Sequence, residues 1–98
     1  MKTKLFRVHH IMGNLCIFAI SNHKAAELFV SEWQYRFGDA PGSFSIEDLV
    51  RFKIEGDFSR HTRNVMRSGA EGIGFYSEGA GWTVYHIGEK RDDSPIRI

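Results

Sequence analysis

The sequence predicts an α+β domain in which an antiparallel sheet carries two helices on one face. Two segments show the three-and-four spacing of apolar residues that is typical of amphipathic helices. Strand-like runs come in pairs joined by glycine-containing turns, and the order of elements is ββαβαββ. Residues 1–88 are expected to form one compact domain, and the charged residues 89–98 a frayed C-terminal tail.

The composition is that of a folded domain with no electrostatic bias. Of the 98 residues 42% are hydrophobic, and 13 basic against 12 acidic residues leave a net charge of +1. Binding to nucleic acid would therefore need a local basic patch. The single Cys16 lies in the apolar run LCIFAI, which predicts a buried thiol in a cytoplasmic protein. No apolar run approaches the roughly 20 residues of a membrane helix.

A hairpin is predicted over residues 4–20. Its two strand-like runs meet at Gly13-Asn14, which suits a type II′ turn and would pair Met12 with Leu15. Both faces of the second strand contain apolar residues, so this strand is expected inside the sheet. One face would carry Phe6, Val8, His10, Met12, Leu15, Ile17 and Ala19, and the other Leu5, Arg7, His9, Ile11, Cys16, Phe18 and Ile20.

An amphipathic helix is predicted over residues 23–37. Asn22 can cap its start, Gly38 can adopt a left-handed turn at its end, and Pro41 prevents continuation. The apolar stripe is expected to lie across the sheet. It comprises Ala25, Ala26, Phe29, Val30, Trp33 and Phe37.

Residues 44–55 are ambiguous. Val50, Phe52 and Ile54 alternate with charged residues, as in a half-buried strand. Ser45 and Asp48 have the spacing that caps a helical turn. We favour a short turn at 45–48 that leads into a strand at 49–55.

A second helix is predicted over residues 58–68, ending at Gly69. Thr62 belongs to its inner side, with Phe58, Val65 and Met66. A second hairpin, with a glycine-rich loop, is predicted over residues 72–88.

The outer side of the second helix is the strongest candidate for a binding site. Arg60, Arg63 and Arg67, with His61 beside them, could engage successive phosphates of a nucleic acid. Aromatic rings that could stack on bases lie on the following hairpin, at Tyr76 and Tyr85. The plainer interpretation is a solvated helix face.

Contact with a protein partner is the other interpretation of the last hairpin. Tyr76, Trp82 and Tyr85 could form an aromatic anchor of the kind that interfaces favour, or they could fill the core. An exposed strand at 4–12 or 82–88 could also pair with its twin in a homodimer.

A toxin-like, metal-independent ribonuclease is a third hypothesis. His61 or His86 could serve as general acid or base, with arginines over the phosphate. Histidine is more often a structural residue than a catalyst, and the histidines lack the spacing of metal-site motifs.

The sequence therefore favours a small, non-catalytic binding or regulatory protein that acts by macromolecular contact, such as an inhibitor or an accessory protein of a mobile element. The nucleic-acid binder and the ribonuclease stay open as alternatives. No catalytic residue, metal ligand or cofactor is predicted.

Overall fold

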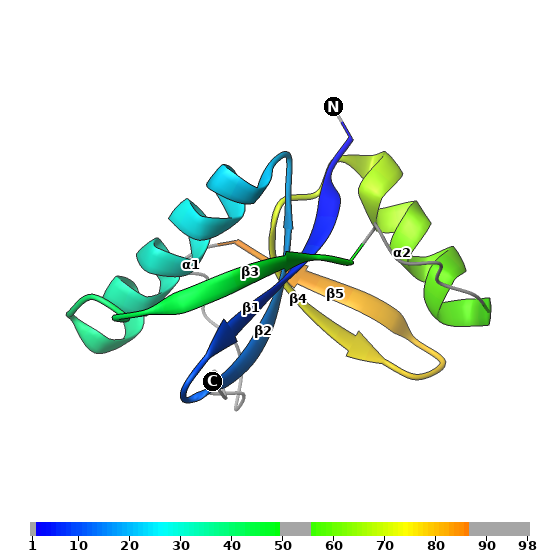
Figure 1. Cartoon of the computed structure of the whole chain (residues 1–98). Coiled ribbons are helices and arrows are strands. Elements are labelled where there is room, and N and C mark those ends of the chain that lie inside the picture. Colours follow the sequence, from blue (N-terminus) through cyan, green and yellow to red (C-terminus); the bar gives the residue numbers. More distant parts are fainter. Residues whose placement is uncertain (1, 50–55, 87–98) are drawn as a thin grey trace.

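The computed structural model describes residues 2–49 and 56–86, with side chains from residue 60 onward in the second of these ranges. The described strands form a five-stranded antiparallel sheet in the order β3-β1-β2-β4-β5, and two helices complete the fold (Figure 1). The predicted α+β class and the element order ββαβαββ are confirmed. The elements are β1 (Lys4–His10), β2 (Gly13–Ala19), α1 (Asn22–Phe37), β3 (Phe44–Asp48), α2 (Gly56–Ser68), β4 (Gly72–Ser77) and β5 (Gly81–Tyr85).

The first hairpin turns two residues earlier than predicted. His10 pairs with Gly13, so the turn is Ile11-Met12, and the predicted turn at Gly13-Asn14 is wrong. The backbone N–H of Met12 donates to Nδ1 of His10 at 3.0 Å, a contact that stabilises this earlier turn. Each residue of β1 pairs with a residue of β2 that lies four positions from its predicted partner. Because four is an even number, the predicted faces of both strands are correct.

Helix α1 covers one face of the sheet. Phe29 and Ala25 of this helix are fully buried and pack against the middle strands, as the apolar stripe predicted. The buried core that they join comprises Phe6, Val8, Leu15, Ile17, Ala19 and Ile73.

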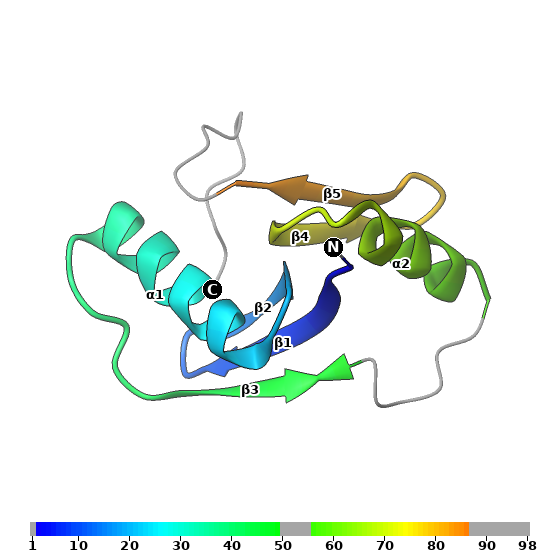
Figure 2. The same cartoon turned by 90° about the horizontal axis from the view of Figure 1, so that it is seen from above.

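Helix α2 covers the opposite face, so the prediction that both helices share one face is wrong. Phe18 follows the core residue Ile17 in β2 and therefore points to the other side of the sheet. There its ring meets Trp82 edge-on at 5.0 Å, and Trp82 donates a hydrogen bond to Thr62 of α2. Because Ile17 and Phe18 are both fully buried, the sheet needs cover on both faces. Figure 2 shows the strands lying between the two helices.

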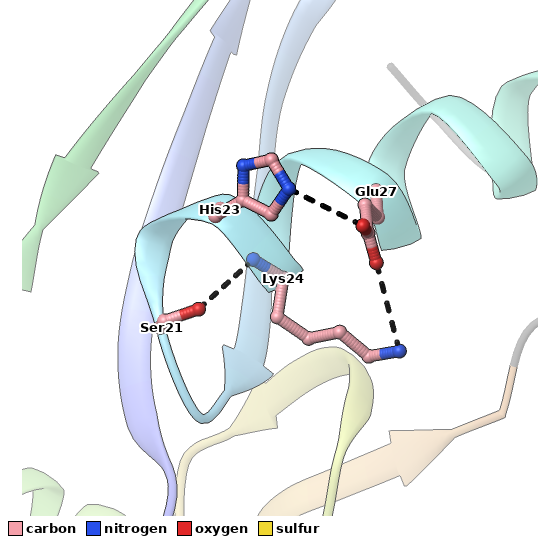
Figure 3. Close-up of polar contacts among 4 residues, drawn as sticks. All are labelled: Ser21, His23, Lys24 and Glu27. Atoms are coloured by element: carbon pink, nitrogen blue, oxygen red, sulfur yellow. Dashed lines mark hydrogen bonds and ion pairs between the residues drawn. The ribbon is translucent and has the colours of Figure 1, made fainter.

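The ends of α1 are fixed by side-chain and backbone hydrogen bonds. Ser21, one residue before the predicted cap, accepts the backbone N–H of Lys24 through Oγ at 3.1 Å (Figure 3). Glu27 lies within ion-pair distance of both His23 and Lys24, at 3.3 and 3.8 Å. Gly38 adopts a φ of 76° and closes the last turn, as predicted.

The buried side of α1 contains a charge that the apolar stripe did not predict. Glu32 is fully buried, and its Oε2 accepts a hydrogen bond from Nε of Arg36 at 2.9 Å. Phe37, by contrast, ends the predicted stripe but is 53% exposed. The predicted apolar stripe therefore faces the sheet in the first three turns of α1, but its last residue, Phe37, does not.

The segment after α1 begins with a strand. The predicted turn at 45–48 is wrong, because β3 pairs with β1 and alternates from Phe44, whose ring packs 4.8 Å from that of Phe29. The strand predicted at 49–55 falls almost wholly outside the described residues.

The last part of the chain follows the sequence prediction more closely. Helix α2 begins two residues earlier than predicted and ends before Gly69, and β4 and β5 form the predicted hairpin over the described residues 72–85. The tail predicted at 89–98 lies outside the described residues. No helix in the described part has the length and apolar content needed to cross a membrane.

Candidate functional site

The seven residues predicted as a binding site are divided between two faces of the molecule. Arg60, Arg63 and Arg67 are exposed on the outer side of α2, while Thr62 on the inner side is buried. Their spacing of three and seven residues places the three arginines along one side of the helix, here called the arginine row. Their role in binding stays a prediction.

Trp82 belongs to the joint between α2 and the sheet. Its Nε1 donates to Oγ1 of Thr62 at 2.8 Å, and its ring packs between those of Phe18 and Tyr76 at 5.0 and 5.3 Å. A Cβ placed on Gly74 would lie 3.0 Å from the rings of Phe18 and Trp82, so this contact is tight. These contacts assign Trp82 a part in packing.

The two tyrosines of the last hairpin lie on different faces. Tyr76 contacts His61 of α2, with the rings 6.3 Å apart. Tyr85 packs 5.6 Å from Phe75, which belongs to the core on the α1 side. The proposed anchor of Tyr76, Trp82 and Tyr85 is therefore not one surface.

The two candidate catalytic histidines are also apart. His61 lies over Gly81, where a Cβ would come within 2.7 Å of its Nδ1. His86 follows the other end of β5, five residues along the chain, a distance of about 16 Å in an extended strand. They cannot serve together as one acid–base pair.

Cys16, predicted to be a buried thiol, is only partly buried on the α2 side of the sheet, opposite Arg7 of β1. Burial raises the pKa of the Cys16 thiol, and the nearby Arg7 guanidinium opposes this rise without cancelling it. A raised pKa disfavours the thiolate that nucleophilic chemistry requires.

One further surface, missed in the sequence, lies where the β1–β2 turn meets the end of α1. Ile11 is 93% exposed, Met12 63% and Phe37 53%. His10 links the turn to the helix, because its ring lies 4.5 Å from that of Trp33, which in turn lies 4.4 Å from that of Phe37. We call Ile11, Met12, Trp33 and Phe37 the tip patch.

Hydrogen bonds hold the frame of the tip patch in place. Nε2 of His10 lies 2.7 Å from the carbonyl oxygen of Pro41, while Nδ1 accepts the N–H of Met12. Since a carbonyl oxygen only accepts, the neutral ring with its hydrogen on Nε2 satisfies both bonds. Nε1 of Trp33 donates to Oδ1 of Asp39 at 3.0 Å. The turn, the helix end and the loop after it are therefore tied together.

A hollow of about 430 Å³ runs along α1, but its described lining comes from this helix alone: His23, Ala26, Glu27, Val30 and Ser31. Among the residues that the structure describes, no three side chains of His, Cys, Asp or Glu gather in a way that could hold a metal ion.

No protein-family model, curated protein or solved structure matches this chain. Its function has to be inferred from its own surfaces.

Proposed function

We propose that the chain is a small, non-catalytic binding protein that contacts a partner protein through the tip patch. The observation that supports this most is the exposure of Ile11, Met12 and Phe37 at one end of the fold, around the partly buried Trp33. Single exposed apolar residues are ordinary, whereas several near one another are typical of interaction sites. Here His10 brings them near one another, because its Nδ1 accepts the N–H of Met12 and its ring lies 4.5 Å from that of Trp33.

The hydrogen bonds at the base of the patch also favour binding. Apolar side chains on a fixed frame lose less conformational freedom on association than those on a mobile loop. The bonds of His10 to Pro41 and Met12, and that of Trp33 to Asp39, supply such a frame. Trp and Met are both favoured in interface cores, and Met adapts its shape to the surface that it meets.

A regulatory role in the cytoplasm is part of this proposal. The single Cys16 has no internal disulfide partner, as is usual in a reducing compartment. An exposed apolar contact surface suits an inhibitor or an accessory protein of a mobile element, because neither role requires chemistry by the chain itself.

A pull-down from the native host tests the proposal with matched variants. The double variant Ile11→Ser/Met12→Ser should lose a partner that the wild type retains, while Arg63→Ala/Arg67→Ala should keep it. Both variants should melt within a few degrees of the wild type, because all four positions are exposed. Retention of the same partner by the tip variant would refute the proposal.

A second candidate, binding of nucleic acid, is favoured by the arginine row. If Arg60, Arg63 and Arg67 each neutralise one phosphate, affinity for a mixed DNA and RNA pool should fall about 20- to 40-fold between about 50 and 200 mM salt. Arg63→Ala/Arg67→Ala should weaken binding and flatten this dependence. Binding that is absent or insensitive to salt would exclude it.

A ribonuclease is the weakest of the three proposals, because its candidate groups are dispersed. It would have to use either His61 or His86 with partners near that residue alone. Intact RNA after incubation with the purified protein, at the concentration that captures a partner, would exclude it.

A further inference from the structure

β1 ends at the base of the tip patch. This strand lies inside the sheet, between β2 and β3, so the strand at 4–12, one of the two predicted as a dimer edge, is not an edge and that prediction is wrong. Its last residue, His10, pairs with Gly13 of β2 and with Phe44 of β3. One nitrogen of the His10 ring contacts the β1–β2 turn, and the other contacts the loop that follows α1. His10 therefore joins the turn to this loop.

The two nitrogens of the His10 ring have opposite roles. Nε2 donates to the carbonyl oxygen of Pro41 at 2.7 Å, while Nδ1 accepts the backbone N–H of Met12 at 3.0 Å. Only the neutral ring with its hydrogen on Nε2 can do both. A second proton would bind to Nδ1 and would then face the N–H of Met12, so that one donor would point at another.

The two hydrogen bonds respond differently to that proton. Nε2 carries its hydrogen in both forms of the ring, so the bond to Pro41 is kept and is strengthened by the positive charge. The bond from Met12 is lost, because imidazolium has no acceptor. The rings of Phe29 and Trp33, 5.8 and 4.5 Å from that of His10, can attract the cation. Protonation therefore releases the turn while the ring stays against α1.

We propose that protonation of His10 is a switch that releases the β1–β2 turn, and with it Ile11 and Met12, from the base of the tip patch. Imidazole is the side chain that normally gains a proton between about pH 5 and about pH 8. A released turn has more conformational freedom to lose when a partner binds. The consequence for binding rests on the proposed function: the partner protein should bind about two- to tenfold more weakly to the protonated form, which corresponds to the loss of one hydrogen bond.

Other titratable groups lie on β1 and on the elements around His10. Carboxylates ordinarily ionise below about pH 5, so a response between about pH 5.5 and about pH 8 is expected from histidine. His9, the preceding residue of β1, points to the opposite face of the sheet and lies 2.9 Å from Glu47, which makes it the control for His10. The remaining charged groups are Glu32 and Arg36 of α1, which form an ion pair, Asp39 of the following loop, which accepts from Trp33, and Asp48 of β3, which lies opposite Phe6.

NMR spectroscopy of the full chain alone tests the switch. At about pH 8 the imidazole ¹⁵N signals of His10 should show a hydrogen on Nε2 and none on Nδ1. As the pH falls toward about 5.5, the amide proton of Met12 should move to lower frequency in step with protonation of His10, because it loses its acceptor. A neutral ring with its hydrogen on Nδ1, or a Met12 amide that does not follow His10, would overturn the proposal.

Two matched substitutions locate the response. His10→Asn keeps a side-chain oxygen that can accept the N–H two residues on, as in an Asx turn, but it cannot titrate, so its Met12 amide should not respond to pH. His9→Asn is the control and should respond like the wild type. A response that persists in His10→Asn, or one that disappears in His9→Asn, would contradict the assignment to His10. The wild-type titration decides the proposal without any substitution, so it does not depend on the folding of a variant.

Partner capture at about pH 8 and about pH 5.5 separates the switch from the proposed function. The wild type and His9→Asn should bind the captured partner about two- to tenfold more weakly at the lower pH, and His10→Asn should bind it equally at both. Equal binding by the wild type at both values, with His10 protonated at the lower one, would overturn the control of binding by His10. Capture of no partner at either pH would refute the proposed function, while the Met12 amide of the free chain decides the switch.

Discussion

The two helices are attached to the sheet in different ways. α1 buries Phe29 and Ala25 completely in an apolar core. Among the described contacts of α2 are the hydrogen bond from Trp82 to Thr62 and the backbone bond from Thr3 to Met66. The surfaces that they leave differ as well. α1 ends in the exposed apolar tip patch, and α2 presents the arginine row. Charged residues opposite a buried stripe are expected of any helix, so the apolar exposure is the more informative of the two.

The largest expected effect is on the α1 side. Phe29→Ala should lower the free energy of unfolding by about 3–5 kcal/mol, because it removes a fully buried ring and leaves a cavity. Urea denaturation followed by far-UV circular dichroism would measure this loss. A loss below about 1 kcal/mol would contradict the assignment of Phe29 to the centre of the core.

The buried carboxylate of Glu32 gives the next effect. Arg36→Met should destabilise the fold by about 2–3 kcal/mol, because it removes a hydrogen-bonded cation from a fully buried anion. Arg67→Met, at an exposed position of α2, is the matched control and should change stability by less than about 0.5 kcal/mol. Equal effects of the two substitutions would show that the ion pair contributes little.

The hydrogen bond between Thr62 of α2 and Trp82 should contribute less to stability than the ion pair of Glu32 and Arg36. Thr62→Val keeps the shape of the side chain but removes the acceptor for Nε1 of Trp82, at an expected cost of about 1–2 kcal/mol. In a double-mutant cycle with Trp82→Phe the two losses should not add, because both remove the same bond. Additive losses would mean that the two residues act independently.

The smallest effect concerns Cys16 on the α2 side of the sheet. Its raised pKa should make reaction with a disulfide reagent at mildly alkaline pH slower than that of the unfolded chain. The unfolded chain loses its thiol proton at lower pH than the folded one, so the contribution of this group to stability should fall as pH rises above the usual thiol range. Equal rates for folded and unfolded protein would contradict the partial burial of Cys16.

How much the sequence reveals differs between these regions for physical reasons. The stripe of α1, the second hairpin and the faces of the first hairpin follow from local periodicity, and an even displacement of register preserves the faces. The placement of α2 depends on which face of β2 still needs cover. Ile17 and Phe18 point to opposite faces of β2 and are both fully buried, so each face needs a helix to cover it.

The site was harder to predict than the fold because exposure is decided by distant contacts. From the sequence, Trp82 could be an exposed anchor, whereas in the structure it donates a hydrogen bond to Thr62 of α2. From the sequence, Met12 is a strand residue, whereas in the structure it lies in the turn, where its N–H donates to His10. The available signal was the adjacency of Ile11 and Met12 to a turn, since a turn residue points into solvent more often than a strand residue does.

The most direct test of the tip patch uses the methyl groups of methionine. The chain has three methionines, of which Met12 is exposed in the tip patch and Met66 is half-buried on α2. With [¹³C-methyl]methionine, addition of the partner captured by pull-down should shift or broaden the Met12 signal and leave Met66 unchanged. A response at Met66 with none at Met12 would place the contact on α2 and contradict the account.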